Sequence, residues 1–497
     1  MADETTPPTA PDTDDPTPST TPAEPQDDLV STRHQLRVGR TTLDYTATTG
    51  RVVLREEVHK DGTFTGFRPK AEMSLTSYVV DGGAPDRPVT FAFNGGPGSS
   101  SVWLHLGLLG PRRVLMGDVG ALLPPPYALA DNAESLLAVS DLVFIDPVST
   151  GYSRTLEGTK AEPFHGYQGD IESVGELIRI WTSRHRRWMS PKFVAGESYG
   201  TLRGAALVEH LQTRHAMYLN GLILISSVLD LSSIDFEKQR NDRAHALYLP
   251  TYAAIAHFHG RLGRRSLRSA IADAEEYAAR DYPWVLSRGD RLTARERTAA
   301  VRKIASLTGL SEDYVDRAEL RIEHIRFFGE LLRDERRVAG RLDGRFSGPA
   351  ASALAEEMDA DPAMDAIRGP YAAAFNHYVR DELGYESDLP YEQLTSRVHP
   401  WSFKDFEGRP IDVTPQLERA MRANPHLQVH VGYGYYDGAT PHFAAEDVIA
   451  HLRIPEELRA NIEHRYYEAG HMMYVHEPSR RKQSKDLAAF VTRASTR

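Results

Sequence analysis

The run from Lys192 to Gly200, KFVAGESYG, constrains the fold more than any other part of the sequence. Its apolar stretch leads directly into a Gly-x-Ser-x-Gly motif, and residues 201–210 can continue as a helix. A serine on a tight turn between a strand and a helix is held at the top of a sheet with its hydroxyl exposed, and the flanking residues must be small. The motif therefore predicts strands followed by helices and a nucleophilic serine, Ser198.

The surrounding pattern is typical of a parallel sheet. Helical stretches, notably residues 170–183, separate the apolar runs. These runs, expected to be buried strands, are 89–93, 141–146, 192–195, 221–225, 427–431 and 462–467. Strands that alternate with helices predict an α/β fold, a mostly parallel sheet covered on both faces. Two earlier β-rich stretches, 34–56 and 71–80, precede them.

The composition changes along the chain and suggests four segments. The first, 1–28, is rich in Pro, Thr and Asp and holds eight acids without a Lys or Arg. It is expected to be a disordered tail, either a plain solubilising segment or a docking or stalk segment. A first core segment, 29–235, is followed by an Ala-, Arg- and Glu-rich stretch, 236–404, with helical patterns and no convincing strand. That stretch predicts a helical cap insertion, before the core resumes over 405–497.

The overall composition limits the classes of function. The formal net charge of the 497 residues is −11, and nothing in the sequence indicates nucleic-acid binding. No apolar run is long enough for a membrane helix. The chain contains no cysteine, which excludes disulfides, thiolate catalysis and Cys-ligated metals. No basic and apolar leader is visible, so we expect a cytoplasmic protein. We predict no cofactor and no metal site.

A nucleophilic serine needs a base, and the base needs an acid that orients it. Asp437 follows the strand run 427–431 and opens a turn, so it would point into the site from the carboxyl end of a strand. The same residue could instead cap the helix that begins near Pro441. His471 follows the last strand run, after Gly470. Asp230 is a rival acid, because it follows the strand run 221–225.

The tetrahedral intermediate of acyl transfer needs two backbone N–H groups as an oxyanion hole. Tyr199, the residue after the nucleophile, provides one. The loop Asn94–Gly98 follows a strand run and is expected to provide the other, from Gly96. The loop could alternatively be a tight turn before a helix capped by residues 99–101. It lacks the spacing and the lysine of a phosphate-binding loop.

Together these motifs resemble the serine carboxypeptidase family of the α/β-hydrolase fold, as a bacterial-type member. The resemblance covers about 30–230 and 405–497. The motifs that carry it are Asn94-Gly95-Gly96-Pro97-Gly98-Ser99-Ser100, Phe144-Ile145-Asp146-Pro147-Val148 with Gly151-Tyr152-Ser153, Gly196-Glu197-Ser198-Tyr199-Gly200, Asp437 in its Tyr-Tyr-Asp turn, and Gly470-His471-Met472.

The resemblance implies the removal of the C-terminal residue of a peptide substrate. Ser198 would attack, His471 would transfer the proton and Asp437 would orient the histidine. The N–H groups of Gly96 and Tyr199 would form the oxyanion hole. An esterase or an acyltransferase would use the same acyl-enzyme, and a binding protein that retains the fold is a third alternative. The sequence leaves the oligomeric state open.

The resemblance also implies a site for the terminal carboxylate of the substrate. Asn94, Gly95 and Glu197 would bind it, with Glu197 protonated. The sequence departs from the family at Leu108, where many members carry a second glutamate, and at Ser99, where a cysteine is usual. A like-charge neighbour that would favour protonation of Glu197 is therefore missing. The neighbouring residues Trp103, Thr440 and Met472 are candidates for lining the leaving-residue pocket.

Overall fold

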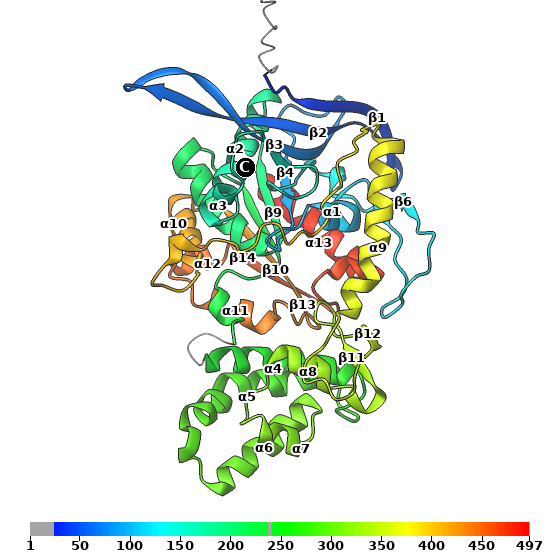
Figure 1. Ribbon diagram of the computed structural model, residues 1–497, viewed down its shortest axis with the longest axis vertical. Helices are drawn as coiled ribbons and strands as arrows, with labels where there is room; N and C mark the ends of the chain where they lie inside the picture. Colours follow the sequence, from blue (N-terminus) through cyan, green and yellow to red (C-terminus); the bar gives the residue numbers. More distant parts are fainter. Residues whose placement is uncertain (1–23, 237–240, 497) are drawn as a thin grey trace, which may run out of the picture.

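The computed structural model describes residues 24–236 and 241–496. Its centre is one mixed sheet with the strand order β1-β2-β3-β7-β4-β9-β10-β13-β14, which β8 joins through β3 (Figure 1). The strands are β1 (Asp28–Val38), β2 (Thr41–Lys60), β3 (Thr63–Val80), β4 (Val89–Phe93), β7 (Asp141–Ile145), β8 (Arg154–Thr155), β9 (Lys192–Ser198), β10 (Gly221–Ser227), β13 (Gln428–Gly434) and β14 (Ile462–Tyr467).

The six strands from β7 to β14 run parallel, and β1, β2 and β3 form an antiparallel extension next to β7. The parallel strands coincide with the six apolar runs in the sequence, which confirms a mostly parallel central sheet. Because parallel strands end at the same edge, the loops after β4, β9, β13 and β14 meet there.

Helices cover both faces of the sheet, and alternate strand residues point into two separate cores. In β10, Leu222 and Leu224 pack on one side, whereas Ile223 and Ile225 pack on the other. The first core includes helices α2 (Tyr167–Arg184), α3 (Tyr199–His215), α10 (Thr414–Ala423) and α11 (His442–Ala450). The second includes α1 (Val102–Leu104), α9 (Pro362–His377) and α13 (Glu477–Ser495).

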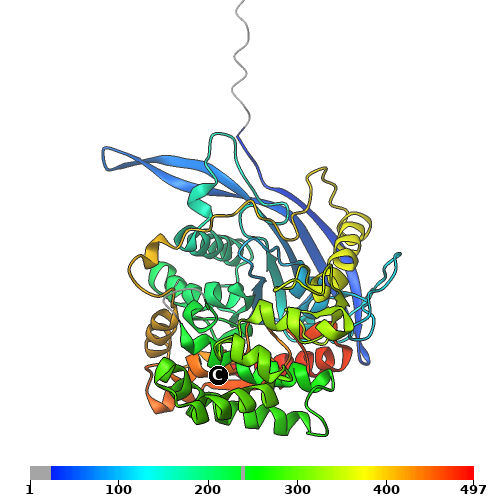
Figure 2. The same ribbon diagram turned by 60° about the horizontal axis from the view of Figure 1, so that its bottom comes forward.

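The first part of the predicted insertion forms a helical lobe with its own apolar core (Figure 1, Figure 2). The sequence pattern predicts one helix over 313–332, but the structure has two, because Glu319 and Leu320 adopt positive φ angles of 51° and 64°. A short hairpin also occurs where no strand is predicted. The elements are α4 (Asp242–Phe258), α5 (Leu267–Arg288), α6 (Ala294–Thr308), α7 (Glu312–Arg317), α8 (His324–Glu330), β11 (Arg337–Ala339) and β12 (Ser347–Pro349).

The second part of the insertion packs on the sheet itself. Tyr371 and Tyr378 belong to the same core as Tyr78 of β3. The Tyr78 hydroxyl lies 2.6 Å from His105 Nε2 and 3.0 Å from the Tyr378 hydroxyl, and all three side chains are buried. The segment predicted as one helical insertion, 236–404, thus contains a distal lobe and a part integrated into the core.

Ordered contacts begin before the predicted end of the tail. Asp27 accepts a hydrogen bond from the Val53 N–H at 2.9 Å. Asp28 begins β1 and accepts one from the Tyr385 hydroxyl at 2.7 Å. Residues 24–28 therefore contact the core, and the rest of the predicted tail lies outside the described residues. No helix in the described part of the chain is long and apolar enough to cross a membrane.

Candidate active site

Ser198 ends β9 and immediately precedes α3, as the sequence motif predicts. Its φ of 60° and ψ of −130° are unusual for a residue with a side chain, and such strain is typical of a functional turn. A Cβ on Gly196 would lie 2.1 Å from the Gly200 oxygen, and one on Gly200 would lie 3.1 Å from the Asn94 carbonyl. The glycines let the turn close against the loop after β4, which leaves Ser198 at the edge of the sheet.

The loops after β13 and β14 bring a carboxylate to a histidine. Asp437 Oδ2 lies 2.9 Å from His471 Nδ1. Asp437 is completely buried, and its carboxylate also accepts hydrogen bonds from the N–H groups of Ala439 and Thr440 and from the Thr440 hydroxyl. A carboxylate only accepts hydrogen bonds, so Nδ1 of His471 carries the proton. The other ring nitrogen, Nε2, is therefore free to act as a base.

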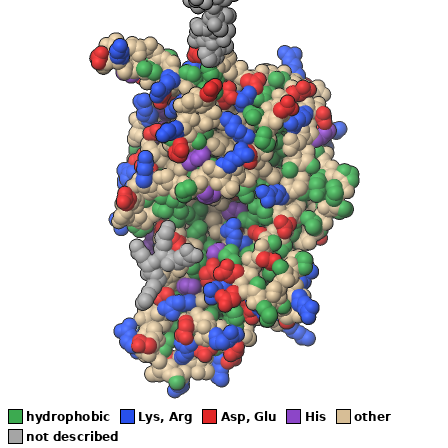
Figure 3. Space-filling view, in the orientation of Figure 1, with side chains coloured by type: hydrophobic (Ala, Val, Ile, Leu, Met, Phe, Trp, Pro, Cys, Tyr) green, Lys and Arg blue, Asp and Glu red, His purple; other side chains and the backbone are tan. Residues whose placement is uncertain are grey.

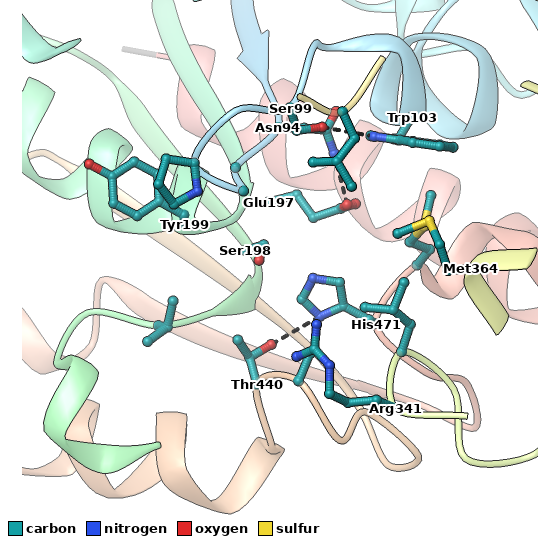
Figure 4. Close-up of a pocket in the computed structure, with 18 of the residues that line it drawn as sticks. Asn94, Ser99, Trp103, Glu197, Ser198, Tyr199, Arg341, Met364, Thr440 and His471 are labelled. Carbon is teal, nitrogen blue, oxygen red and sulfur yellow. Dashed lines mark hydrogen bonds between the residues drawn. The ribbon is translucent and has the colours of Figure 1, made fainter. Parts of the chain in front are cut away.

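Burial lowers the pKa of His471, but the charge of Asp437 and its hydrogen bond outweigh this effect, and the net result is a raised pKa. Asp437 therefore stabilises the imidazolium that forms when the histidine accepts a proton. The Ser198 hydroxyl faces the His471 ring across the cavity in Figure 4. The two side chains are not hydrogen-bonded, and such contacts often tighten only when substrate binds.

Asp230, the rival acid, lies elsewhere. It caps the short helical turn Leu231–Ser233 by accepting a hydrogen bond from the Ser232 N–H at 2.9 Å, and it contacts Arg243 at 3.2 Å. The structure thus brings Asp437, and not Asp230, to His471.

The glycine-rich loop after β4 lies directly against the serine turn. A Cβ on Gly95 would lie 2.4 Å from the backbone nitrogen of Tyr199, so only glycine permits this approach. Gly96 has a φ of 101°, which also favours glycine, and it lines the cavity with Tyr199 and Ser198. The loop therefore brings Gly96, one of the two expected oxyanion donors, into the cavity that Ser198 and Tyr199 also line. Ser101 precedes α1 but makes no side-chain capping bond, in contrast to the alternative considered from sequence.

Asn94 and Glu197 form a buried polar pair beside Ser198. Asn94 Nδ2 donates to Glu197 Oε1 at 2.8 Å, and the Leu104 N–H donates to Asn94 Oδ1 at 3.1 Å. Glu197 is 3% exposed, and its Oε2 has no hydrogen-bond partner among the described residues. Burial raises the pKa of Glu197 to about 7, although the charge of His471 and the side chains of Tyr474 and Asn94 lower it. Glu197 is therefore neutral in mildly acidic solution, with one oxygen free (Figure 4).

Leu108, which stands where many family members carry a glutamate, is buried in a π-helical turn, His105–Leu109, and does not line the cavity. Tyr371 and Tyr474 fill the space next to this turn, since a Cβ on Gly107 would lie within 2.6 Å of both side chains. Burial is the main cause of the raised pKa of Glu197, and the charge of Asp437 adds a smaller contribution.

Sequence reasoning missed the residue that holds the Asn94 loop. Arg203 of α3 donates to Asp170 of α2 at 2.8 Å and to the Asn94 carbonyl at 2.6 Å. Both charged side chains are 1% exposed. The available signal was the position of Arg203 one turn after Tyr199, on the helix face that packs against the sheet.

Sequence reasoning also missed a contribution from the insertion. The His471 N–H donates to the Leu342 carbonyl at 2.6 Å, and the Gly438 N–H donates to the Arg341 carbonyl at 2.9 Å. Asp343 accepts a hydrogen bond from the Gly470 N–H at 3.0 Å. Residues 341–343 therefore fix the loops that carry both the acid and the base. No local motif in the sequence marks this segment.

Ser198, His471, Asn94 and Glu197 line one cavity of about 650 Å³. Figure 3 shows a hollow between the α/β part and the helical lobe, with hydrophobic side chains around it. Trp103, Thr440 and Met472 all line the cavity, as considered from sequence, although Thr440 also bonds to the triad acid. Within residues 24–236 and 241–496, no group of three or more His, Asp or Glu side chains could hold a metal ion.

Comparisons with known proteins agree with this geometry. The family model described as "Serine carboxypeptidase" matches residues 81–493. Serine carboxypeptidase-like 13 and 11 of Arabidopsis thaliana are 26% and 25% identical over 177 and 188 residues. These matches cover 34% and 36% of this chain and only 40% and 41% of the relatives.

Among solved structures, the prohormone-processing carboxypeptidase Kex1(delta)p of Saccharomyces cerevisiae superimposes with a TM-score of 0.55 at 14% identity, covering 91% of each chain. This likeness confirms the α/β-hydrolase fold. The family model extends over most of the chain, including the glycine-rich loop, the serine turn and the loops after β13 and β14. The chain belongs to the serine carboxypeptidase family.

Proposed function

We propose that the protein is a serine carboxypeptidase, which removes the C-terminal residue of peptides. The observation that carries this proposal is the Asn94–Glu197 pair beside Ser198, because a neutral, buried carboxyl with a free oxygen can donate a hydrogen bond to a substrate carboxylate. An ionised glutamate at the same position would repel that carboxylate.

The geometry supports the following course. The terminal carboxylate binds at Asn94 and Glu197, which places the last peptide bond over Ser198. His471 Nε2 accepts the Ser198 proton as Oγ attacks the carbonyl carbon, and the N–H groups of Gly96 and Tyr199 bind the oxyanion. The imidazolium then protonates the leaving amine. Water, activated by the same histidine, hydrolyses the acyl-enzyme and frees the shortened peptide.

The decisive experiment compares N-blocked dipeptides with their C-terminal amides between about pH 4 and pH 8. We expect rapid cleavage of the free acids only. For these, kcat/KM should fall as the pH rises through about 7, where Glu197 ionises. The Glu197→Gln variant keeps a hydrogen-bond donor but cannot ionise, so its kcat/KM should not fall as the pH rises through about 7. Equal rates on acids, amides and simple esters would instead indicate an esterase or acyltransferase.

Ser198→Ala should lower kcat by about a million-fold, since the members of a triad act as a unit. The variant should keep the circular dichroism spectrum and melting temperature of the wild type within a few degrees. Activity that survives this substitution would refute the site assignment.

We further propose a bacterial-type member of the family. The absence of cysteines supports it, because the chain needs no oxidising compartment to fold.

A further inference from the structure

Two arginines line the active-site cavity without a salt bridge or a side-chain hydrogen bond to any described residue. Arg341 and Arg368 both contribute to its wall. Neither guanidinium forms an ion pair or a side-chain hydrogen bond with any of the described residues. Most other arginines near the core of the protein are paired, as Arg203 is with Asp170. Two cations that line one cavity and form no salt bridge can attract an anionic group of the substrate.

Both arginines lie on the side of the cavity where the leaving residue must sit. On α9, Met364, Arg368 and Tyr371 are spaced by four and three residues and therefore share a face. Tyr371 packs against Trp103, with ring centroids 5.0 Å apart. Burial raises the pKa of Tyr371, and the charge of Glu197 adds to this effect. This face of α9 thus adjoins the carboxylate-binding pair.

Figure 4 shows the same arrangement for Arg341. Trp103, Met364 and Arg341 lie on the side of Glu197 and His471, whereas Tyr199 lies on the opposite side. The C-terminal residue, whose carboxylate is held by Glu197, extends toward the first group. The residue that stays on the serine would extend toward the Tyr199 side, where Phe403 packs against Tyr199 with ring centroids 6.4 Å apart. Val228, Leu231 and Ile234 are further apolar residues of the lining.

The backbone of Arg341 is held in place from two directions. Its carbonyl accepts a hydrogen bond from the Gly438 N–H at 2.9 Å, next to the triad acid, and its N–H donates to Asp361, the residue that caps α9, at 3.2 Å. Arg341 is half-buried, and Arg368 is exposed. The backbone of Arg341 is therefore fixed beside the loop that carries Asp437, whereas Arg368 presents its side chain to solvent.

One buried carboxyl, Asp361, lies close to Arg341: burial raises its pKa, and the charge of Arg341 lowers it. This single carboxyl cannot balance two guanidinium groups. Glu197 is the one acid among the described residues that line the cavity, and it is neutral below about pH 7. Asp437 is buried behind His471 and paired with it. The leaving-residue side of the cavity therefore carries a net positive charge in mildly acidic solution.

We propose that Arg341 and Arg368 select an acidic C-terminal residue, aspartate or glutamate, as the residue that the enzyme removes. The inference rests on the proposed carboxypeptidase function and names its substrate class. A side-chain carboxylate on the leaving residue can pair with the two guanidinium groups while the α-carboxylate binds at Asn94 and Glu197. Phe403 and Tyr199 on the other side favour a hydrophobic residue in the penultimate position.

The test measures kcat/KM at pH 6 for N-blocked Phe-Glu and Phe-Gln, which differ only in the side-chain charge. We expect the wild type to prefer Phe-Glu by about tenfold, the usual value of one charge-assisted hydrogen bond over a neutral one. Arg368→Gln and Arg341→Gln should each lower the Glu-to-Gln ratio. Arg368→Glu should invert the preference, so that Phe-Lys is cleaved faster than Phe-Glu.

Arg40→Gln is the matched control, because it removes one positive charge from the β1–β2 turn, outside the cavity, and should leave the ratio unchanged. A ratio near one in the wild type, with both peptides cleaved, would overturn the inference and leave the carboxypeptidase function intact. A ratio that Arg368→Glu does not alter would also overturn it. Cleavage of neither peptide would contradict the proposed function itself.

Discussion

Glu197 shows how one side chain can link the chemistry of the site to the stability of the fold. In the sequence it is one of the two variable residues of a Gly-x-Ser-x-Gly motif. In the structure it is buried, bonded to Asn94 through one oxygen and unpartnered at the other. Its pKa of about 7, against an ordinary value of 4.5, means that the folded protein holds a proton that the unfolded chain releases.

This difference predicts the sign of a pH effect on stability. Between pH 4.5 and 7 only the folded state keeps the Glu197 proton, so the free energy of unfolding falls as the pH rises through this window, by about 3 kcal/mol in total. Glu197→Gln should remove that contribution. Urea unfolding of both proteins at pH 4.5 and pH 7.5 measures the difference.

Glu457→Gln, at an exposed position of α12 (Glu456–Arg459), is the control and should change neither value. If wild type and Glu197→Gln show the same pH dependence, Glu197 is ionised in the folded protein, and the carboxylate site as described is wrong.

At the scale of elements, α2 and α3 are joined by the buried Asp170–Arg203 pair, which also holds the loop after β4 through the Asn94 carbonyl. The Arg203 guanidinium lies over the rings of Phe93 and Tyr199, 5.1 and 5.4 Å from their centroids. One arginine therefore positions the strand end, the glycine-rich loop and the helix that follows the nucleophile.

Removing one partner of a buried ion pair leaves an uncompensated charge, so Arg203→Met should lower the free energy of unfolding by about 3–5 kcal/mol. The double variant Asp170→Leu/Arg203→Leu should be more stable than Arg203→Met, because it removes both charges. Denaturant unfolding measures both effects.

The matched control is Arg280→Met, which breaks the exposed pair with Glu276 on α5 and should cost less than about 1 kcal/mol. If Arg203→Met costs no more than Arg280→Met, the buried pair does not hold these helices together.

At the scale of the whole molecule, segments far apart in sequence meet around His105. Its ring stacks on Phe144 of β7 at 4.2 Å and bonds to Tyr78 of β3, whose hydroxyl contacts Tyr378 at the end of the insertion. Burial lowers the pKa of His105 to about 3, well below its ordinary 6.5. The contact between the insertion and the sheet therefore depends on a neutral histidine.

The pH effect of His105 on the free energy of unfolding has the opposite sign to that of Glu197. The unfolded chain binds a proton at His105 below pH 6.5 and the folded protein does not, so stability is complete above pH 6.5 and falls as the pH drops, by about 3 kcal/mol at pH 4. Compared with wild type, His105→Gln should lose less stability between pH 7 and pH 4. The exposed His426→Gln should behave like wild type, and an unchanged acid dependence in His105→Gln would contradict the assignment.

The parallel sheet and its loops could be predicted because their determinants are local. Apolar runs such as 89–93 and 221–225 must be buried, and the glycines around Asn94 and Ser198 permit backbone shapes that other residues resist. The order of Ser198, Asp437 and His471 along the chain also followed from their positions after strand runs. These features depend on a few neighbouring residues.

The tertiary structure alone decided which groups surround those loops. The sequence by itself determined the sheet, the serine turn and the candidate residues at the strand ends. It could not show that Tyr371 and Tyr474 bury Glu197, that Arg203 holds Asn94, or that Arg341 and Arg368 enter the cavity. The residues that these contacts bring together lie between about a hundred and almost three hundred positions apart in the sequence. The physical reason is that burial, charge and pKa depend on the groups nearby in space, and the chain brings these together only when it folds.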